Sequence, residues 1–106
     1  MDSNQTASGN ERSLRIILPE LYHFITTELE NRYNIHKYDI QANAIKEESG
    51  YKVILYYGDG FAHQMSRSLT NDVLHNKREA LTEFLEEAGE SCKEVMIADY
   101  FRMMKP

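Results

Sequence analysis

The hydrophobic positions of this chain concentrate in its middle, where residues 51–69 predict a β-hairpin. Residues 53–57 are β-branched, aromatic or large aliphatic in succession, and such side chains favour a strand because they pack well on a pleated surface. Gly58-Asp59-Gly60 follows them, and glycine accepts the positive φ angles of tight turns at little steric cost. We therefore expect the chain to reverse there into a second strand over residues 61–67.

The two faces of this hairpin follow from the length of its loop. A two-residue loop pairs even positions of the first strand with odd positions of the second, and side chains alternate between the faces. One predicted face carries Lys52, Ile54, Tyr56, Phe61, His63, Met65 and Arg67, and the other carries Val53, Leu55, Tyr57, Ala62, Gln64 and Ser66. Both faces are partly apolar, whereas a sheet covered on one side only has one polar face. The C-terminal segment, a second copy of the chain or a partner is then needed to cover the second face.

A helix and another strand are predicted before the hairpin. Apolar residues recur at helical spacing from Pro19 to about Tyr33, and Asn34 suits the helix end because it tolerates the left-handed conformation. Residues 38–46 alternate between apolar and polar, which is the pattern of a half-buried strand. Its Ile40, Ala42 and Ala44 join the face of Val53, Leu55 and Tyr57. The small alanines leave room for the first helix on that face.

The C-terminal third predicts one or two helices. Thr70 or Asn71 is a suitable N-cap for a helix to about Ala88, which Gly89 would interrupt. Ser91 and Glu94 have the spacing of a capping box for a last amphipathic segment. The predicted class is α+β: a helix, a three-stranded antiparallel β-meander, then one or two C-terminal helices. Residues 1–12 are polar and predict a disordered tail, which leaves 13–106 as a single α+β domain.

Composition narrows the function classes. The chain has 106 residues, 42% of them hydrophobic and 27% charged, which is typical of a globular domain. No run approaches the ~20 apolar residues of a membrane span, and the first residues lack the apolar core of a signal peptide. We therefore expect a cytoplasmic protein with no membrane contact. The net charge of -5 disfavours a general polyanion binder, and the single Cys92 excludes an intramolecular disulfide.

Candidate chemistry is sparse. His75 and Glu79 stand four residues apart on the predicted second helix, but two residues do not make a metal site. Gly58-Asp59-Gly60 lacks the Gly-Lys-Ser/Thr ending of a phosphate loop. The glutamates Glu83, Glu86, Glu87 and Glu90 form an acidic stripe, which is either a solvated face or a contact for basic groups of a partner. We predict no catalytic residue, no metal and no cofactor, and hence no enzyme.

The order helix, three strands, helix resembles that of the double-stranded-RNA-binding domain. Asn76-Lys77-Arg78-Glu79-Ala80 looks similar to the basic cluster of that family, which implies contacts with phosphates across a groove. The sequence departs from the family at 47–50, where the Gly-Pro-x-His pattern is missing. RNA binding is therefore an alternative, and a nucleic acid is not the expected partner.

The face of Ile54, Tyr56, Phe61, His63 and Met65 is the predicted interaction surface. A contiguous apolar patch seldom stays exposed on a soluble monomer, aromatic and methionine side chains suit interfaces, and two-fold dimers are the commonest oligomers. The sequence therefore predicts a small non-catalytic protein-interaction or regulatory module that forms a homodimer. The alternatives are an RNA-binding module and a small enzyme with its site between subunits.

Overall fold

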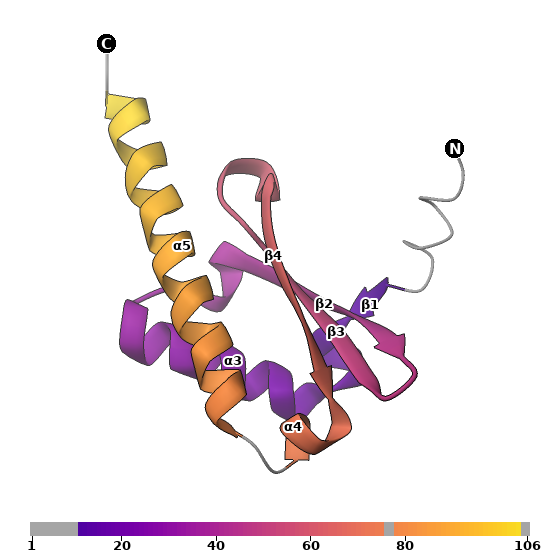
Figure 1. The fold of residues 1–106 in the computed structure, drawn as a ribbon. Coiled ribbons are helices and arrows are strands. Elements are labelled where there is room, and N and C mark those ends of the chain that lie inside the picture. The colour runs from indigo at the N-terminus through magenta and orange to yellow at the C-terminus, as the bar shows by residue number, and fades with distance from the viewer. Residues whose placement is uncertain (1–10, 76–77, 105–106) are drawn as a thin grey trace, which may run out of the picture.

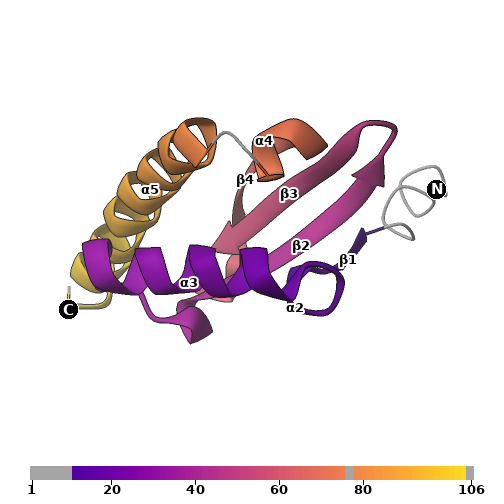
Figure 2. The same cartoon turned by 90° about the horizontal axis from the view of Figure 1, so that it is seen from below.

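The computed structural model describes residues 11–75 and 78–104, in which helices pack against one face of an antiparallel sheet (Figures 1 and 2). The four strands β1 (Glu11–Ser13), β2 (Ile40–Glu47), β3 (Gly50–Tyr57) and β4 (His63–Thr70) lie side by side in chain order. The helices are α2 (Leu14–Ile17), α3 (Pro19–Tyr33), α4 (Asn71–His75) and α5 (Arg78–Met104), with short 3-10 turns η1 (Lys37–Asp39) and η2 (Asp59–Phe61). The predicted α+β class is confirmed, with four strands rather than three.

The core lies between the sheet and the helices. Strand β2 pairs with β3 so that the predicted residues share a face, with Ile40 opposite Tyr57 and Ala42 opposite Leu55. The buried residues of these strands share one cluster with those of the helices: Leu14, Ile25, Leu29, Leu81, Phe84, Leu85, Ala88 and Cys92. The prediction that the first helix covers this face of the sheet is therefore confirmed.

Helix α3 spans the predicted residues. Pro19 occupies its first turn, where a missing N–H costs no hydrogen bond. Asn34 follows its end in the left-handed conformation, at φ 59°, and its N–H bonds to the carbonyl of Glu30. The predicted helix start after β4 is also confirmed. Thr70 is one of the two predicted N-caps, and its Oγ1 accepts the N–H of Val73 at 3.2 Å.

Strand β1 corrects the predicted tail, since Glu11 and Arg12 belong to the sheet. They pair with Ile45 and Ala44 on the outer side of β2. Three residues are too few for an alternating pattern to be visible in the sequence. The apolar run after β1 forms α2, in which Leu14 is completely buried. Residues 1–10 lie outside the described residues.

Two corrections concern the C-terminal helices. The predicted helix over 71–88 is divided between α4 and α5, and α5 continues through Gly89 to Met104. Packing favours glycine at position 89, because a Cβ atom there would lie 2.5 Å from the ring of Tyr33 and the ring would have to move. The predicted capping box at Ser91 therefore starts no helix.

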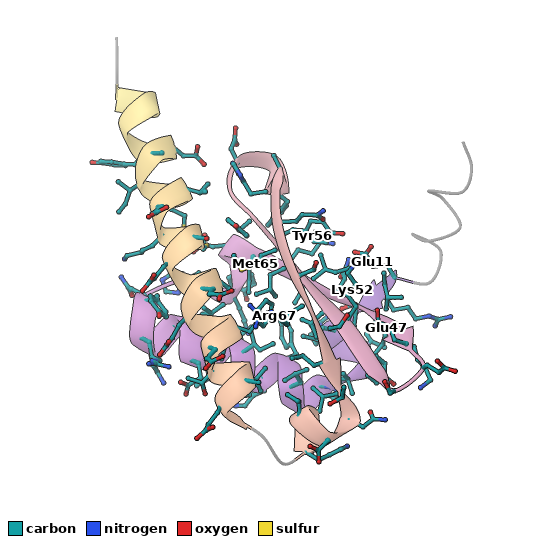
Figure 3. The ribbon with its side chains drawn as sticks, viewed as in Figure 1. Glu11, Glu47, Lys52, Tyr56, Met65 and Arg67 are labelled. Carbon is teal, nitrogen blue, oxygen red and sulfur yellow. The ribbon has the colours of Figure 1, made fainter. Side chains whose placement is uncertain are left out.

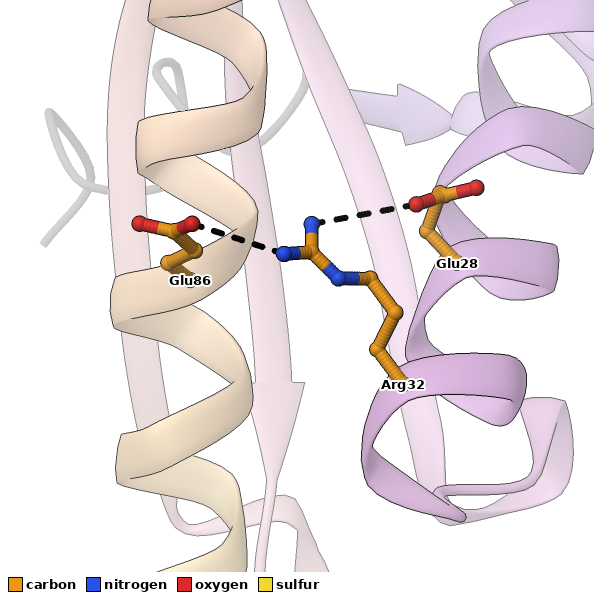
Figure 4. Close-up of polar contacts among 3 residues, drawn as sticks. All are labelled: Glu28, Arg32 and Glu86. Carbon is orange, nitrogen blue, oxygen red and sulfur yellow. Dashed lines mark hydrogen bonds and ion pairs between the residues drawn. The ribbon is translucent and has the colours of Figure 1, made fainter.

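An ion-pair bridge also connects α3 to α5 (Figure 4). The guanidinium of Arg32 lies 3.5 Å from Oε2 of Glu86 and 3.8 Å from Oε1 of Glu28. All three side chains are partly exposed, so the bridge contributes little to stability.

Candidate interaction surface

The register between β3 and β4 overturns the predicted hairpin faces. Tyr57 pairs with His63 and Leu55 with Met65, so five residues, 58–62, form the loop instead of two. An odd loop length pairs residues of like parity, which moves every side chain of the second strand to the opposite face. Gly58, Gly60 and Phe61 all have positive φ in this loop. Gly58-Asp59-Gly60 predicted a two-residue loop, and nothing in these three residues indicated a loop of five.

The five residues of the predicted interaction surface therefore do not share one face. Ile54 and Tyr56 point away from the helices, whereas Met65 pairs with core residue Leu55 and packs against the core. His63 stacks on Tyr57 with ring centroids 5.8 Å apart, and Phe61 lies in η2. Figure 3 shows Met65 on the side of β4 toward α5. The prediction that these five residues lie together on one face of the sheet is therefore wrong.

The face of the sheet away from the helices is mostly polar. The cross-strand pairs Gln41 with Tyr56 and Tyr56 with Gln64 both lie on it. The Tyr56 hydroxyl donates to Oε2 of Glu11, which also accepts a bond of 2.8 Å from Nδ2 of Asn43. Burial, followed by this bond to Glu11, raises the pKa of Tyr56 to about 12. Ile54 is only 6% exposed there, so this face does not present it as part of an exposed apolar patch.

Strand β4 forms one edge of the sheet. The N–H of Asn71 bonds to the carbonyl of Ser49 at 2.8 Å, in line with the β3–β4 register. Bonded pairs recur at every second residue of an antiparallel ladder, so the odd positions of β4 bond to β3. The backbone N–H and C=O groups of Gln64, Ser66 and Ser68 consequently point outward. All three residues are exposed.

Carboxylates of α5 flank this edge on the helix side. The guanidinium of Arg67 on β4 pairs with Glu87 of α5 and lies 5.4 Å from the ring centroid of Phe84. Glu83 and Glu94 stand one turn before and two turns after Glu87, on the same side of the helix, and both are exposed. We name Glu83, Glu87 and Glu94 the acidic strip.

The predicted acidic stripe is a different set, Glu83, Glu86, Glu87 and Glu90, and its members differ in what they contact. Glu86 bridges to Arg32 of α3 and Glu87 pairs with Arg67 of β4. Glu83 and Glu90 are exposed on α5. Half of the stripe therefore has partners within the chain.

A second surface feature lies beside the loop between β3 and β4. A recess of about 380 Å³ is lined by Tyr38, Asp39, Gly58, Asp59, Gly60, Phe61, Met96, Asp99 and Tyr100. Tyr38 is 82% exposed, Phe61 41% and Tyr100 60%. Together with Ile97 they make up four of the five large hydrophobic residues that are exposed in the described part of the chain. We call this feature the hairpin recess.

A second hollow, of about 270 Å³, lies where α2 and α3 meet α4. Its walls are mostly apolar, among them Leu18, Phe24 and Leu74, and Glu20 and His75 also line it. A catalytic site needs polar groups that converge on one reacting atom. This hollow instead lies between helices, and most of its walls are apolar side chains that pack against the core.

The residues proposed for chemistry are dispersed. His75 ends α4 and Glu79 belongs to α5, so the predicted placement of both on one continuous helix is wrong. Within 11–75 and 78–104 no three histidines, cysteines or carboxylates gather as metal ligands. Cys92 is 2% exposed, and burial raises its pKa to about 11, which is the environment of an unreactive structural thiol.

Comparison with known proteins does not extend this description. No family model, no curated protein and no solved structure matches the chain. No helix in the described ranges has the length and apolar character needed to cross a membrane. Of the basic cluster that resembles the RNA-binding family, Asn76 and Lys77 lie outside the described residues.

Proposed function

We propose that this chain is a small non-catalytic protein-interaction module that receives an extended segment of a partner as a fifth strand beside β4. The observation that carries the proposal is the row of outward backbone groups at Gln64, Ser66 and Ser68. A strand added to such an edge gains main-chain hydrogen bonds along its whole length. The polar open face and the helix-covered face supply different surroundings for alternate side chains of that strand.

The sequence of β4 lacks the usual protection of an edge. Edge strands are commonly guarded by lysine, proline, a bulge or very short length. Strand β4 pairs with β3 over eight consecutive residues without a bulge, and it contains no lysine and no proline. Its one arginine, Arg67, points inward to Glu87 of α5, and this inward charge is the one edge-protecting device in the strand. We take the outward backbone groups of the edge as open to pairing.

The acidic strip favours a basic segment as the occupant. A partner strand beside β4 would run past the side of α5 that carries Glu83 and Glu94, on either side of the Glu87–Arg67 pair. Lysine or arginine on that side of the segment gains electrostatic attraction, which speeds association and fixes register. In a two-fold pairing of β4 with a second copy, the two acidic strips would face one another, and like charges oppose such contact. The homodimer predicted from the sequence is the competing occupant.

Proline at Ser66 tests the proposal. The N–H of Ser66 points outward, so Ser66→Pro removes an edge donor without breaking the ladder to β3. Ser66→Ala is the matched control because it keeps that N–H. The probes are an octapeptide of alternating threonine and lysine, and its counterpart with glutamate in place of lysine. Binding is followed by the amide NMR shifts of β4, and circular dichroism checks that each variant is folded.

We expect the lysine peptide to bind the wild type and Ser66→Ala alike, and Ser66→Pro about tenfold more weakly, for a loss of ~1–2 kcal/mol. Equal binding by Ser66→Pro would show that β4 is not the site. Sedimentation of the wild type tests the second copy. A dimer at micromolar concentration that Ser66→Pro dissociates would replace the basic segment by a second copy as occupant.

A further inference from the structure

The hairpin recess brings aromatic rings and carboxylates together from three separate parts of the chain. Tyr38 and Asp39 come from η1, Asp59 and Phe61 from η2, and Met96, Asp99 and Tyr100 from α5. No lysine or arginine is among the described residues that line it. The tertiary fold, rather than one local turn, therefore brings aromatic rings and carboxylates together in the described lining of this hollow.

Two of the carboxylates are oriented by backbone groups. Oδ2 of Asp39 accepts the N–H of His36 at 3.1 Å, and Oδ2 of Asp99 accepts the N–H of Asp59 at 3.1 Å. A carboxylate has about four lone-pair sites, so Asp39 can accept a charged donor beside the N–H of His36. The bond from Asp59 to Asp99 also ties η2 to α5 and holds two walls of the recess together.

The aromatic rings stand in an environment suited to a cation. Nζ of Lys37 lies 5.5 Å from the ring centroid of Tyr38, which is within the distance of a cation–π contact. A planar guanidinium can stack on aromatic faces and bond carboxylates in a bidentate manner, which an ammonium cannot do. Since no cluster suited to a metal ion exists in the described residues, an organic cation fits the lining better than a metal.

We propose that the hairpin recess binds an arginine side chain of the partner segment, an inference that rests on the proposed function only in assigning the arginine to a protein. The guanidinium stacks against the rings of Tyr100 and Phe61, and its N–H groups donate to the carboxylates of Asp59 and Asp39. The three-carbon stem of the arginine lies against the thioether of Met96. Charge complementarity and aromatic stacking together select arginine.

A pair of small probes tests the recess without any strand pairing. N-acetylarginine amide is titrated into the full chain and compared with N-acetylcitrulline amide, which has nearly the same shape but no charge, and with N-acetyllysine amide. Amide NMR shifts at Gly58, Gly60 and Asp59 report binding. We expect the arginine probe to bind at millimolar concentration, and the citrulline and lysine probes several-fold more weakly.

Three variants separate the recess from general charge effects. Asp59→Asn removes one carboxylate and keeps the backbone N–H that bonds to Asp99, and Tyr100→Leu removes one ring but stays apolar. Each should weaken the arginine probe by about two- to fivefold, the size of one cation–π or ion-pair contact at an exposed site. Ile16→Ala is the control, because Ile16 is 75% exposed on α2, which does not line the recess, and should leave binding unchanged.

Equal affinity for the arginine and citrulline probes would overturn the inference, and so would equal affinity for arginine and lysine. Shifts that appear only at β4, or none at all, would also overturn it. These outcomes are distinct from failure of the proposed function. The threonine–lysine octapeptide and Ser66→Pro report on the edge of β4 alone, so either result can hold while the other fails.

Discussion

The contact between α3 and α5 at Gly89 allows a sharp test of the packing. Glycine in a helix interior costs ~1 kcal/mol relative to alanine, so Gly89→Ala would stabilise α5 if propensity alone mattered. The added Cβ would lie 2.5 Å from Cδ2 and Cε2 of Tyr33 and 2.8 Å from Cζ. Inserting a methyl group into such a contact costs ~1–3 kcal/mol. We therefore expect Gly89→Ala to lower the free energy of unfolding by about 1 kcal/mol, the difference of these two effects.

Removing the ring should reverse the sign. In a Tyr33→Ala background the methyl group added at position 89 meets no ring, so Gly89→Ala should raise the free energy of unfolding by ~1 kcal/mol. The coupling between the two positions is then about 2 kcal/mol, well above the error of additivity for independent sites. Urea denaturation of the four proteins, followed by circular dichroism, measures this cycle. Equal stabilisation by Gly89→Ala in both backgrounds would show that contact with Tyr33 is not the reason for glycine at position 89, and would refute the reasoning.

Three further predictions concern single residues. The fold raises the pKa of Tyr56 from 10.0 to about 12, so Tyr56 keeps its proton to higher pH than in the unfolded chain. The free energy of unfolding should therefore fall as pH rises from 10 to 12. Tyr56→Phe should reduce that fall, as measured by urea titrations. Phe61 has φ 56°, so Phe61→Gly should be more stable than Phe61→Ala by ~1 kcal/mol in the same assay, and the opposite order would contradict the strained turn. Cys92 should react with Ellman's reagent at pH 8 only slowly until urea is added, since the thiol is 2% exposed; rapid reaction of the folded protein would contradict its burial.

Where neighbouring residues alone decide the conformation, the sequence was sufficient. Helix α3 has a proline in its first turn, an apolar stripe and an asparagine at its end, and it spans Pro19–Tyr33 as predicted. The pairing of β2 with β3 was also predictable, because either of the loop lengths considered keeps the same parity. The actual loop has two residues, between Glu47 and Gly50.

Features that depend on distant contacts were not predictable. Gly89 reads as a helix breaker in the sequence, and only its position against Tyr33 explains why α5 continues through it. Strand β1 consists of three residues. It is held by pairing with distant residues of β2, among them Ile45 and Ala44, and by the hydrogen bond from Tyr56 to Glu11. No local pattern encodes such a strand, because its stability comes from the sheet it joins.

The loop between β3 and β4 had the largest effect on the functional inference. With two residues in the loop, Met65 would lie beside Tyr56 on an apolar outer face that requires a cover. With five, Met65 turns toward the core, and the serines of β4 fall on the polar outer face. The structural reason for an association surface on that face is then removed, and the unpaired backbone of β4 becomes the stronger reason for association. The same longer loop places Phe61 at the hairpin recess, so one unrecognised turn accounts both for the misplaced surface and for part of the lining of that recess.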